Sequence, residues 1–160
     1  MKILEGLKIV DLTRVYTGPF CGQILADMGA IITKVEDDGP NSNERSWPPF
    51  AEGTLESTYF IGLNRGKRSI ELNLKNDQAK EIFYALVKDA DIVMENFAPG
   101  VADKLGVGYK DCKKVKPDII YLSTSAFGQY GPLSSLPGYD ALAQAMGGLM
   151  SITGYPEMPL

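Results

Sequence analysis

The sequence predicts an α/β fold in which helices flank a mostly parallel sheet. Short apolar runs alternate with longer segments whose apolar residues recur at helical spacing. The run 7–12, the helix pattern 17–28 and the run 30–35 form the first strand–helix–strand unit. Because parallel strands need such a crossover connection, the order predicts a Rossmann-like sheet.

The first helix pattern has Thr17 as a candidate N-cap and Pro19 in its first turn, and it ends at Gly29. We expect its buried face to be apolar and to comprise Phe20, Ile24, Leu25 and Met28. Residues 37–58 are polar and rich in proline and glycine, and so long a segment without periodicity is typically functional or mobile. Period-two alternation over 69–74 then predicts a half-buried strand.

The next elements continue the alternation of helix and strand. Asn76 is a candidate cap for a helix that runs through Lys88. The apolar face of this helix comprises Ala79, Ile82, Phe83, Leu86 and Val87. The apolar runs 91–94 and 118–122 predict two further short, buried strands.

The last segment begins with a loop over 125–138 that is rich in glycine, serine and proline, followed by a helix pattern over 139–150. The chain then enters a turn at Gly154 and Pro156, and such a turn normally leads into another element. We therefore expect residues 1–160 to be the N-terminal part of a larger α/β domain that further C-terminal sequence completes.

Composition indicates an ordinary globular chain. The 160 residues are 44% hydrophobic and 22% charged, and the net charge of −4 argues against nucleic-acid binding. No apolar run approaches the ~20 residues of a membrane span, and no signal-peptide pattern is present, so we expect a cytoplasmic protein. Histidine is absent, which removes the commonest general base and metal ligand. Two widely separated cysteines predict neither a disulfide framework nor a metal site.

The first strand-to-helix turn, 13–19, lies where doubly wound folds bind phosphate, and Glu36 ends the second strand where a ribose-binding acid would lie. Only one glycine is present where a dinucleotide fingerprint needs three, so NAD binding is a weak alternative. The basic cluster 64–68 could neutralise phosphates, but a charge run is more often a solvated turn, and we favour that interpretation.

Other single residues have ordinary structural explanations. Asp140 opens the last helix and is interpreted as a cap. Cys21 is interpreted as a small packed residue, whereas Cys112, among lysines, could have a lowered pKa. The segment 95–100 follows a buried strand, at the edge where parallel sheets gather ligands, and Lys104 beyond it could reach an anion. From these residues alone, we favour a strand-to-helix loop with an ordinary surface lysine.

Taken together, these segments resemble the class III CoA-transferase family, which includes formyl-CoA and carnitine–CoA transferases. The resemblance extends over the whole chain, and its pieces are short but ordered and correctly spaced. They are residues 4–13, 18–19, 25–30, 34–36, 64, 67–72, 95–97, 99–100, 128, 131–132, 139–140 and 153–154.

The resemblance implies that coenzyme A binds in the cleft above the sheet, as a substrate and with no tightly bound cofactor or metal. Matching positions imply contacts near the thioester end (Tyr16, Thr17), around the adenosine (Leu72, Asn73, Leu74, Lys75), at a further contact (Asn96, Phe97, Ala98), at a phosphate (Lys104) and on the acyl side (Tyr139, Asp140). The implied partners are an acyl-CoA and a small carboxylic acid, and the full-length protein is expected to be an interlocked homodimer.

Three positions depart from the family pattern. Asp37 stands where some members place an arginine against the CoA phosphates, which implies that this contact is lost or moved. Pro137 and Tyr16 replace a lysine and a glutamine of the formyl-CoA enzyme. These differences argue against formyl-CoA and oxalate specificity and leave the acyl group open.

The family's nucleophile is an aspartate that attacks the thioester and forms first a mixed anhydride and then an aspartyl-CoA thioester. We expect this residue just beyond Leu160, so no catalytic residue is assigned within the chain and the chain alone is expected to be inactive. Two alternatives stay open. One is a 2-methylacyl-CoA racemase, which uses a histidine where this chain has Tyr139, and the other is a non-catalytic CoA- or nucleotide-binding module.

Overall fold

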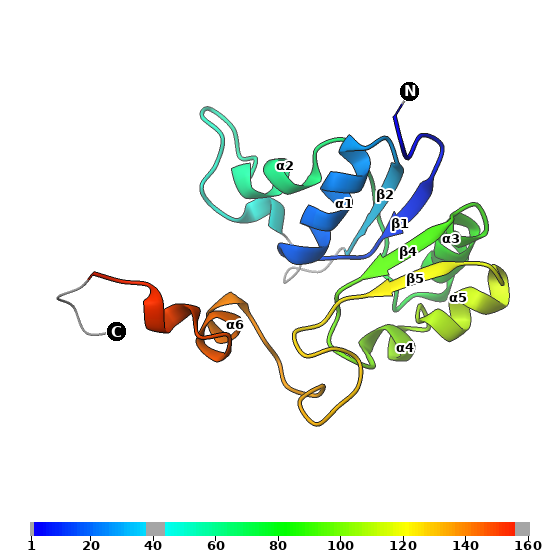
Figure 1. Ribbon diagram of the computed structural model, residues 1–160. Coiled ribbons are helices and arrows are strands. Elements are labelled where there is room, and N and C mark those ends of the chain that lie inside the picture. The colour runs from blue at the N-terminus through cyan, green and yellow to red at the C-terminus, as the bar shows by residue number, and fades with distance from the viewer. Residues whose placement is uncertain (1, 38–43, 156–160) are drawn as a thin grey trace.

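The structure is a computed structural model that describes residues 2–37 and 44–155. Five strands form one sheet in the order β3-β2-β1-β4-β5, and every described pairing is parallel (Figure 1). The strands are β1 (Lys8–Asp11), β2 (Ile31–Glu36), β3 (Arg68–Glu71), β4 (Ile92–Glu95) and β5 (Ile120–Ser123). The predicted Rossmann-like α/β fold is thereby confirmed.

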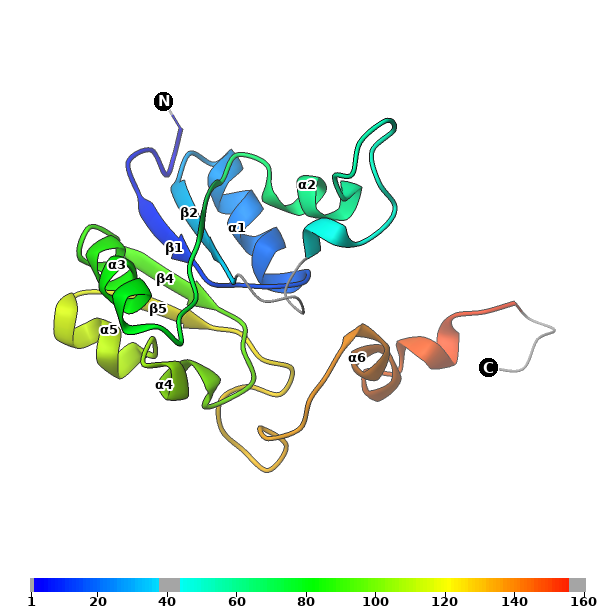
Figure 2. The same ribbon diagram turned by 180° about the vertical axis from the view of Figure 1, so that it is seen from behind.

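Helices cover the two faces of the sheet unequally. They are α1 (Thr17–Asp27), α2 (Thr58–Asn64), α3 (Asp77–Lys88), α4 (Val101–Leu105), α5 (Tyr109–Val115) and α6 (Asp140–Met146), with 3-10 turns η1 (Glu44–Ser46) and η2 (Leu149–Ile152). In the view from behind, α3, α4 and α5 lie in front of the sheet, whereas α1 lies on the other face (Figure 2). The larger core lies under α3 to α5, where Phe83, Val87 and Cys112 pack against Val10 and Val93.

Helix α1 packs through small residues, not through the apolar face expected from the sequence. Its buried residues are Gly18, Pro19, Gly22 and Gln23. Of the four expected residues, only Leu25 packs against the core, and the other three are exposed: Phe20 by 43%, Ile24 by 46% and Met28 by 38%. The glycines allow the helix to approach the loop after β1 closely, which turns the bulky side chains outward.

The predicted bounds of the first helix and of the helix ending at Lys88 agree with α1 and α3, but only one of the two predicted caps is confirmed. Asn76 caps α3 as expected, because its side chain accepts a hydrogen bond from the Gln78 N–H at 2.9 Å. Thr17 is wrong as a cap: α1 begins at Thr17 itself, Tyr16 holds the cap position, and no side chain caps the helix. On α3, Ile82 is 46% exposed and does not belong to the buried face.

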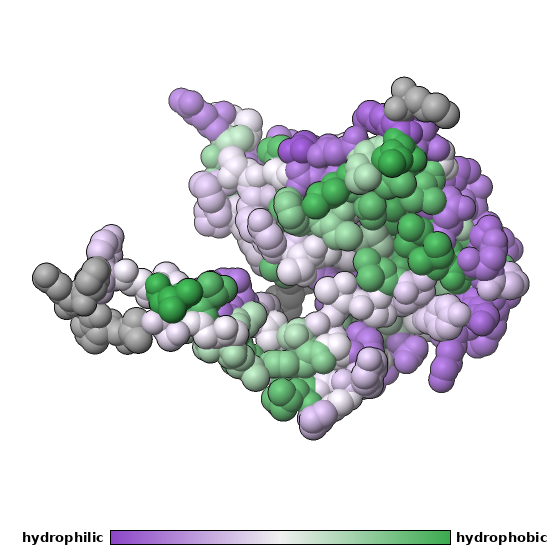
Figure 3. Space-filling view, in the orientation of Figure 1, coloured by the Kyte–Doolittle hydropathy of each residue, from purple (hydrophilic) through white to green (hydrophobic). Residues whose placement is uncertain are grey.

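Two predicted strands differ from their expected extent or burial. The strand expected over 69–74 ends at Glu71, because the chain turns after it. The strand expected to be buried over 118–122 is the edge strand β5, in which Ile120 is 60% and Leu122 38% exposed. Figure 3 shows hydrophobic residues gathered over this region and over α1, on the face that α3 to α5 leave uncovered.

The segment after β5 leaves the sheet. The predicted loop over 125–138 contains no regular element, and the predicted final helix is divided into α6 and η2 by Gly148, whose φ is 81°. Neither α6 nor η2 has a buried residue. Both extend away from the strands as an arm (Figure 1).

We predict that the substitution Gly18→Ala destabilises the fold by about 1–3 kcal/mol, as overpacking typically does. A methyl group at Gly18 would overlap the side chain of Thr13. The matched control is Gly62→Ala in α2, where the added carbon meets nothing within 4 Å and alanine should stabilise the helix by about 0.5–1 kcal/mol. Urea denaturation followed by circular dichroism measures both, and equal effects of the two substitutions would contradict the close approach of α1.

Candidate functional site

The carboxyl ends of β1 and β4 lie side by side where the strand order reverses. From β1 the chain proceeds outward to β2 and β3, whereas β4 and β5 lie on the other side of β1. Parallel α/β sheets bind ligands at such switch points. A pocket of about 260 Å³ opens at this edge. Its lining comes from the ends of the first four strands and from α4: Leu12, Arg14, Val35, Glu36, Asp37, Leu72, Asn73, Leu74, Lys75, Phe97, Val101 and Leu105.

Part of the site implied by the family resemblance comes together in this pocket, namely Leu72, Asn73, Leu74, Lys75 and Phe97. The segment 72–75 reaches the pocket because the chain turns directly after β3. The Lys75 N–H donates to Asn73 Oδ1 at 3.1 Å, and the Asn76 N–H donates to the Asn73 carbonyl at 2.8 Å. This turn buries the two leucines and leaves Lys75 exposed at the rim.

The remaining implied residues do not line the pocket. Lys104 is exposed on α4, next to the lining residue Leu105, and Ala98 is exposed in the loop after β4. Tyr139 is 77% exposed and precedes α6, on the arm that extends away from the sheet. Asp140 is not a cap, since its carboxylate accepts a hydrogen bond from Gln144 and no side chain caps α6.

Tyr16 and Thr17 lie at the start of α1, outside the pocket. The ring of Tyr16 stacks on Phe20 with centroids 5.7 Å apart and lies 6.4 Å from Tyr59. The Tyr59 ring in turn lies 5.6 Å from that of Trp47. A partly exposed row of aromatic rings therefore borders the loop between β1 and α1.

The loop between β1 and α1 is held in a strained conformation by side chains from distant segments. Val15 has a φ of 65°, a left-handed value that a β-branched residue rarely adopts. Asn96 Oδ1 accepts a hydrogen bond from the Arg14 N–H at 2.7 Å, and Asn96 Nδ2 donates one to the Arg14 carbonyl at 2.7 Å. The Asn96 side chain thereby holds the loop backbone at Arg14. The carboxylate of the buried Glu44 accepts the Val15 N–H at 3.0 Å. Strain that is held by several independent contacts is typical of functional sites.

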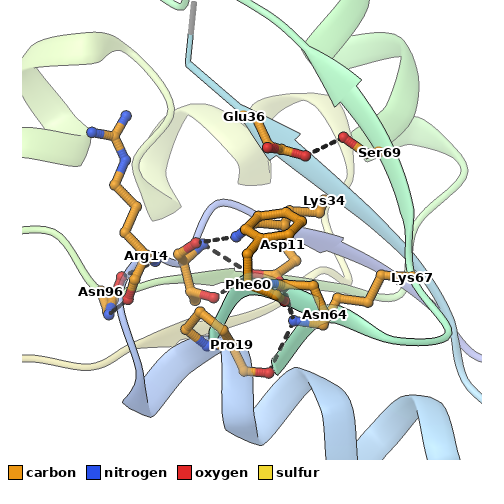
Figure 4. A network of polar contacts seen from close by, with 11 residues as sticks. Asp11, Arg14, Pro19, Lys34, Glu36, Phe60, Asn64, Lys67, Ser69 and Asn96 are labelled. Carbon is orange, nitrogen blue, oxygen red and sulfur yellow. Dashed lines mark hydrogen bonds and ion pairs between the residues drawn. The ribbon is translucent and has the colours of Figure 1, made fainter. Parts of the chain in front are cut away.

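A buried ion pair supports this loop (Figure 4). Lys67 Nζ lies 2.9 Å from Asp11 Oδ2, and the two side chains are 1% and 0% exposed. The ammonium also donates to the Pro19 carbonyl at 2.9 Å and to Asn64 Oδ1 at 3.0 Å. The other oxygen of Asp11 accepts the Thr13 N–H at 2.9 Å. The pair thus joins β1, the following loop, α1 and α2.

This arrangement corrects the interpretation of the basic cluster 64–68 as a solvated turn. Lys67 is buried, and burial lowers its pKa although the carboxylate of Asp11 opposes that effect. Lys34 is a second buried lysine, and its ammonium donates to the Thr13 carbonyl at 2.6 Å. Arg65 is exposed and pairs with Asp27. The cluster therefore supports the fold, chiefly through Lys67.

Glu36 has protein partners in place of a ribose. Its carboxylate is bound by Arg45, with N–O distances of 2.7 and 2.8 Å, and by the hydroxyl of Ser69. Burial alone would raise the pKa of Glu36, but the hydrogen bonds from Arg45 and Ser69 outweigh it and the pKa is lowered. Because Arg45 and Ser69 bind the Glu36 carboxylate, this acid does not offer a free acceptor for the ribose that the dinucleotide alternative requires.

Two buried titratable groups lie outside the pocket lining. Burial raises the pKa of Cys112 to about 12, and the charge of Asp111 adds to this effect, so the lowered pKa considered for this thiol is wrong. Cys21, by contrast, packs against the smaller core cluster as predicted. Burial also raises the pKa of Glu95, whose carboxylate accepts the Phe97 N–H at 2.8 Å.

Within residues 2–37 and 44–155, no group of histidine, cysteine or acidic side chains is arranged to hold a metal ion. No helix in the same ranges has the length and apolar character needed to cross a membrane.

Sequence reasoning considered the turn 13–19, which contains Arg14, as a phosphate-binding position, but it assigned neither Arg14 nor Leu12 to the site. The available signal was position, because both residues directly follow the apolar run of β1, where its carboxyl end meets the switch point. Val101 and Leu105 complete the pocket from α4 as ordinary apolar side chains and carry no chemical signal of their own.

We predict that Lys67→Met destabilises the protein by about 3–5 kcal/mol, because it leaves the carboxylate of Asp11 buried without its cation. Adding Asp11→Asn should recover part of that loss. The matched control is Lys8→Met, which breaks the exposed pair with Asp89 and should cost at most about 1 kcal/mol. The free energies of unfolding come from urea titrations, and similar losses for Lys67→Met and Lys8→Met would contradict the supporting role of the buried pair.

The chain matches the model of CoA-transferase family III over residues 4–160. It is 49% identical over 158 residues to the mouse succinyl-CoA:glutarate CoA-transferase, covering 98% of this chain and 36% of that protein. It is 46% identical to the acetyl-CoA:oxalate CoA-transferase of Acetobacter aceti, covering 97% of this chain and 39% of that protein.

A solved structure supports the same family assignment. A CAIB/BAIF family protein from Brucella suis superimposes with a TM-score of 0.89 at 42% identity, covering 98% of this chain and 42% of that one. The chain thus spans well under half the length of the relatives it matches. With the family model matched over almost every residue, the chain belongs to CoA-transferase family III.

Proposed function

We propose that the protein transfers coenzyme A from an acyl-CoA donor to a carboxylic acid, and that the pocket at the carboxyl end of the sheet receives the adenosine end of CoA. The observation that carries this proposal is the convergence of 72–75 and Phe97 at the switch point. At about 260 Å³, the pocket is smaller than the roughly 300–1,000 Å³ of sites that enclose a drug-sized ligand. It therefore suits one part of CoA and not the whole molecule.

The chemistry of the lining fits an adenosine with phosphates at its edge. Leu72, Leu74 and Val101 offer apolar walls to a base. The cations of the lining are Lys75 and Arg14, of which Arg14 is paired with Asp37. Glu36 also lines the pocket, but its charge is compensated by Arg45. The pantetheine arm would extend from this rim toward the loop between β1 and α1 and its aromatic row.

The relatives support a small carboxylic acid as the acceptor. The mouse and Acetobacter proteins are named for glutarate and oxalate acceptors and for succinyl-CoA and acetyl-CoA donors. A short-chain acid is the feature these names share, and we extend that class to the present protein.

The transfer proceeds through an aspartate nucleophile that lies C-terminal to Leu160. Its carboxylate attacks the thioester carbonyl and expels the CoA thiolate, which leaves an acyl–aspartyl anhydride. The thiolate then attacks the aspartyl carbonyl, which releases the donor acid and forms an aspartyl-CoA thioester. The acceptor carboxylate repeats these two steps in reverse order and leaves as the new acyl-CoA. In this scheme residues 1–160 bind and orient CoA.

The chain supplies the N-terminal part of a larger CoA-binding domain. The uncovered sheet face at Ile120 and Leu122, the outward face of α1 and the arm with α6 present apolar surface that packing normally buries (Figure 3). The rest of a longer polypeptide, in an interlocked cytoplasmic homodimer, would cover it.

Two alternatives have less support. A racemase would need a histidine at the position of Tyr139, and the chain contains none. A non-catalytic module would bind CoA without turnover even in the complete natural protein, and the transferase names of the relatives favour catalysis.

We predict that the complete natural protein binds CoA and that Lys75→Glu weakens this binding about tenfold, corresponding to the loss of roughly 1.4 kcal/mol. Lys75 is the exposed cation at the pocket rim, and its reversal repels the phosphates. The control is Lys110→Glu, an equal charge change on α5 outside the lining. Isothermal titration calorimetry gives both dissociation constants. Binding of NAD but not CoA, or equal losses in both variants, would overturn the proposal.

A further inference from the structure

Arg14 lines the pocket, and its guanidinium is paired with the carboxylate of Asp37. Its guanidinium lies 3.1 Å from Asp37 Oδ2 and 5.4 Å from the centroid of the Phe97 ring. The side chains of Arg14 and Asp37 are 38% and 32% exposed, so the pair faces solvent at the mouth of the pocket. All three residues line the same pocket.

Hydrogen bonds hold the backbone at Arg14 and at the residue that precedes Asp37. Asn96 binds both the N–H and the carbonyl of Arg14, each at 2.7 Å. Asp37 directly follows Glu36, the last residue of β2, whose backbone carbonyl accepts the Leu72 N–H at 2.8 Å. The guanidinium can therefore exchange partners while its backbone stays in place.

We propose that Arg14 is the anion-binding residue of this pocket and that Asp37 is an internal competitor, which a phosphate of the ligand replaces on the guanidinium. The identity of the ligand rests on the proposed function, but the competition itself concerns any phosphate. Asp37 thereby sets the affinity of the pocket for phosphate-bearing ligands.

The exchange is favoured by the charges involved. A partly exposed carboxylate–arginine pair contributes little to stability, so breaking it costs little. A phosphate offers more negative charge and matches the planar donor pairs of a guanidinium. The Phe97 ring lies against the guanidinium and can hold its orientation while the anionic partner changes, since arginine commonly stacks on aromatic faces. In the liganded state the carboxylate of Asp37 remains beside the phosphate and opposes it.

The test is a double-mutant cycle with Asp37→Asn and Arg14→Gln in the complete natural protein, with CoA and inorganic pyrophosphate as separate probes. Asp37→Asn should tighten the binding of both probes severalfold, because it removes the competitor and the repulsion. Arg14→Gln should weaken binding about tenfold. In the Arg14→Gln background, the gain from Asp37→Asn should shrink to the part due to repulsion alone.

The matched control is Asp118→Asn, the same charge change at an exposed residue near the opposite, amino-terminal end of β5. Thermal melts confirm that each variant is folded. Equal effects of Asp37→Asn and Asp118→Asn, or a gain from Asp37→Asn that Arg14→Gln leaves unchanged, would overturn the proposal. If CoA fails to bind but pyrophosphate shows the full pattern, the competition stands and the proposed function falls. If neither probe binds wild type or Asp37→Asn, both fall.

Discussion

One buried ion pair supports the loop between β1 and α1, which contributes Leu12 and Arg14 to the pocket. Asp11 and Lys67 join the end of β1 to the start of α1 and to α2, and both side chains are almost fully excluded from solvent. Asn96 and Glu44 then fix the loop backbone at Arg14 and Val15. A rigid loop at the switch point is what a sheet needs to present backbone and side chains to an anionic ligand without reorganising them.

The same architecture separates support from recognition. Buried lysines and acids hold the loop, whereas the charges that face the pocket mouth, Arg14, Asp37 and Lys75, remain partly or fully exposed. This division explains how one edge of the sheet can contain many charged residues and still offer an anion a place to bind. Every lining residue of the pocket lies before Gly106, so the segments between Leu12 and Leu105 are sufficient to form it.

The fold followed from the sequence because its signals are local: apolar runs, crossover segments and the Asn76 cap. The pocket followed only in part. The segment 72–75 and Phe97 were assigned from the family resemblance, whereas Arg14 was not assigned to the site. Lys67 was misinterpreted as a surface residue, because its burial depends on an ion pair with Asp11, which is distant in sequence. The burial errors at Phe20, Ile24 and Ile120 have a related cause. Hydrophobic periodicity identifies a face that should be covered, but it does not say whether the covering segment lies within these residues.

We propose that the loop after β1 and the turn after β3 together bind the nucleotide end of CoA. The most direct measurement is a map of backbone amide chemical shifts in the isotope-labelled protein during titration with CoA. We expect the largest shifts at Arg14, Asn73, Lys75 and Phe97, while the amides of α5 stay unchanged. A second pocket is lined by residues that include Phe60 and Asn64. Shifts concentrated there, with none at Arg14 or Lys75, would contradict this assignment.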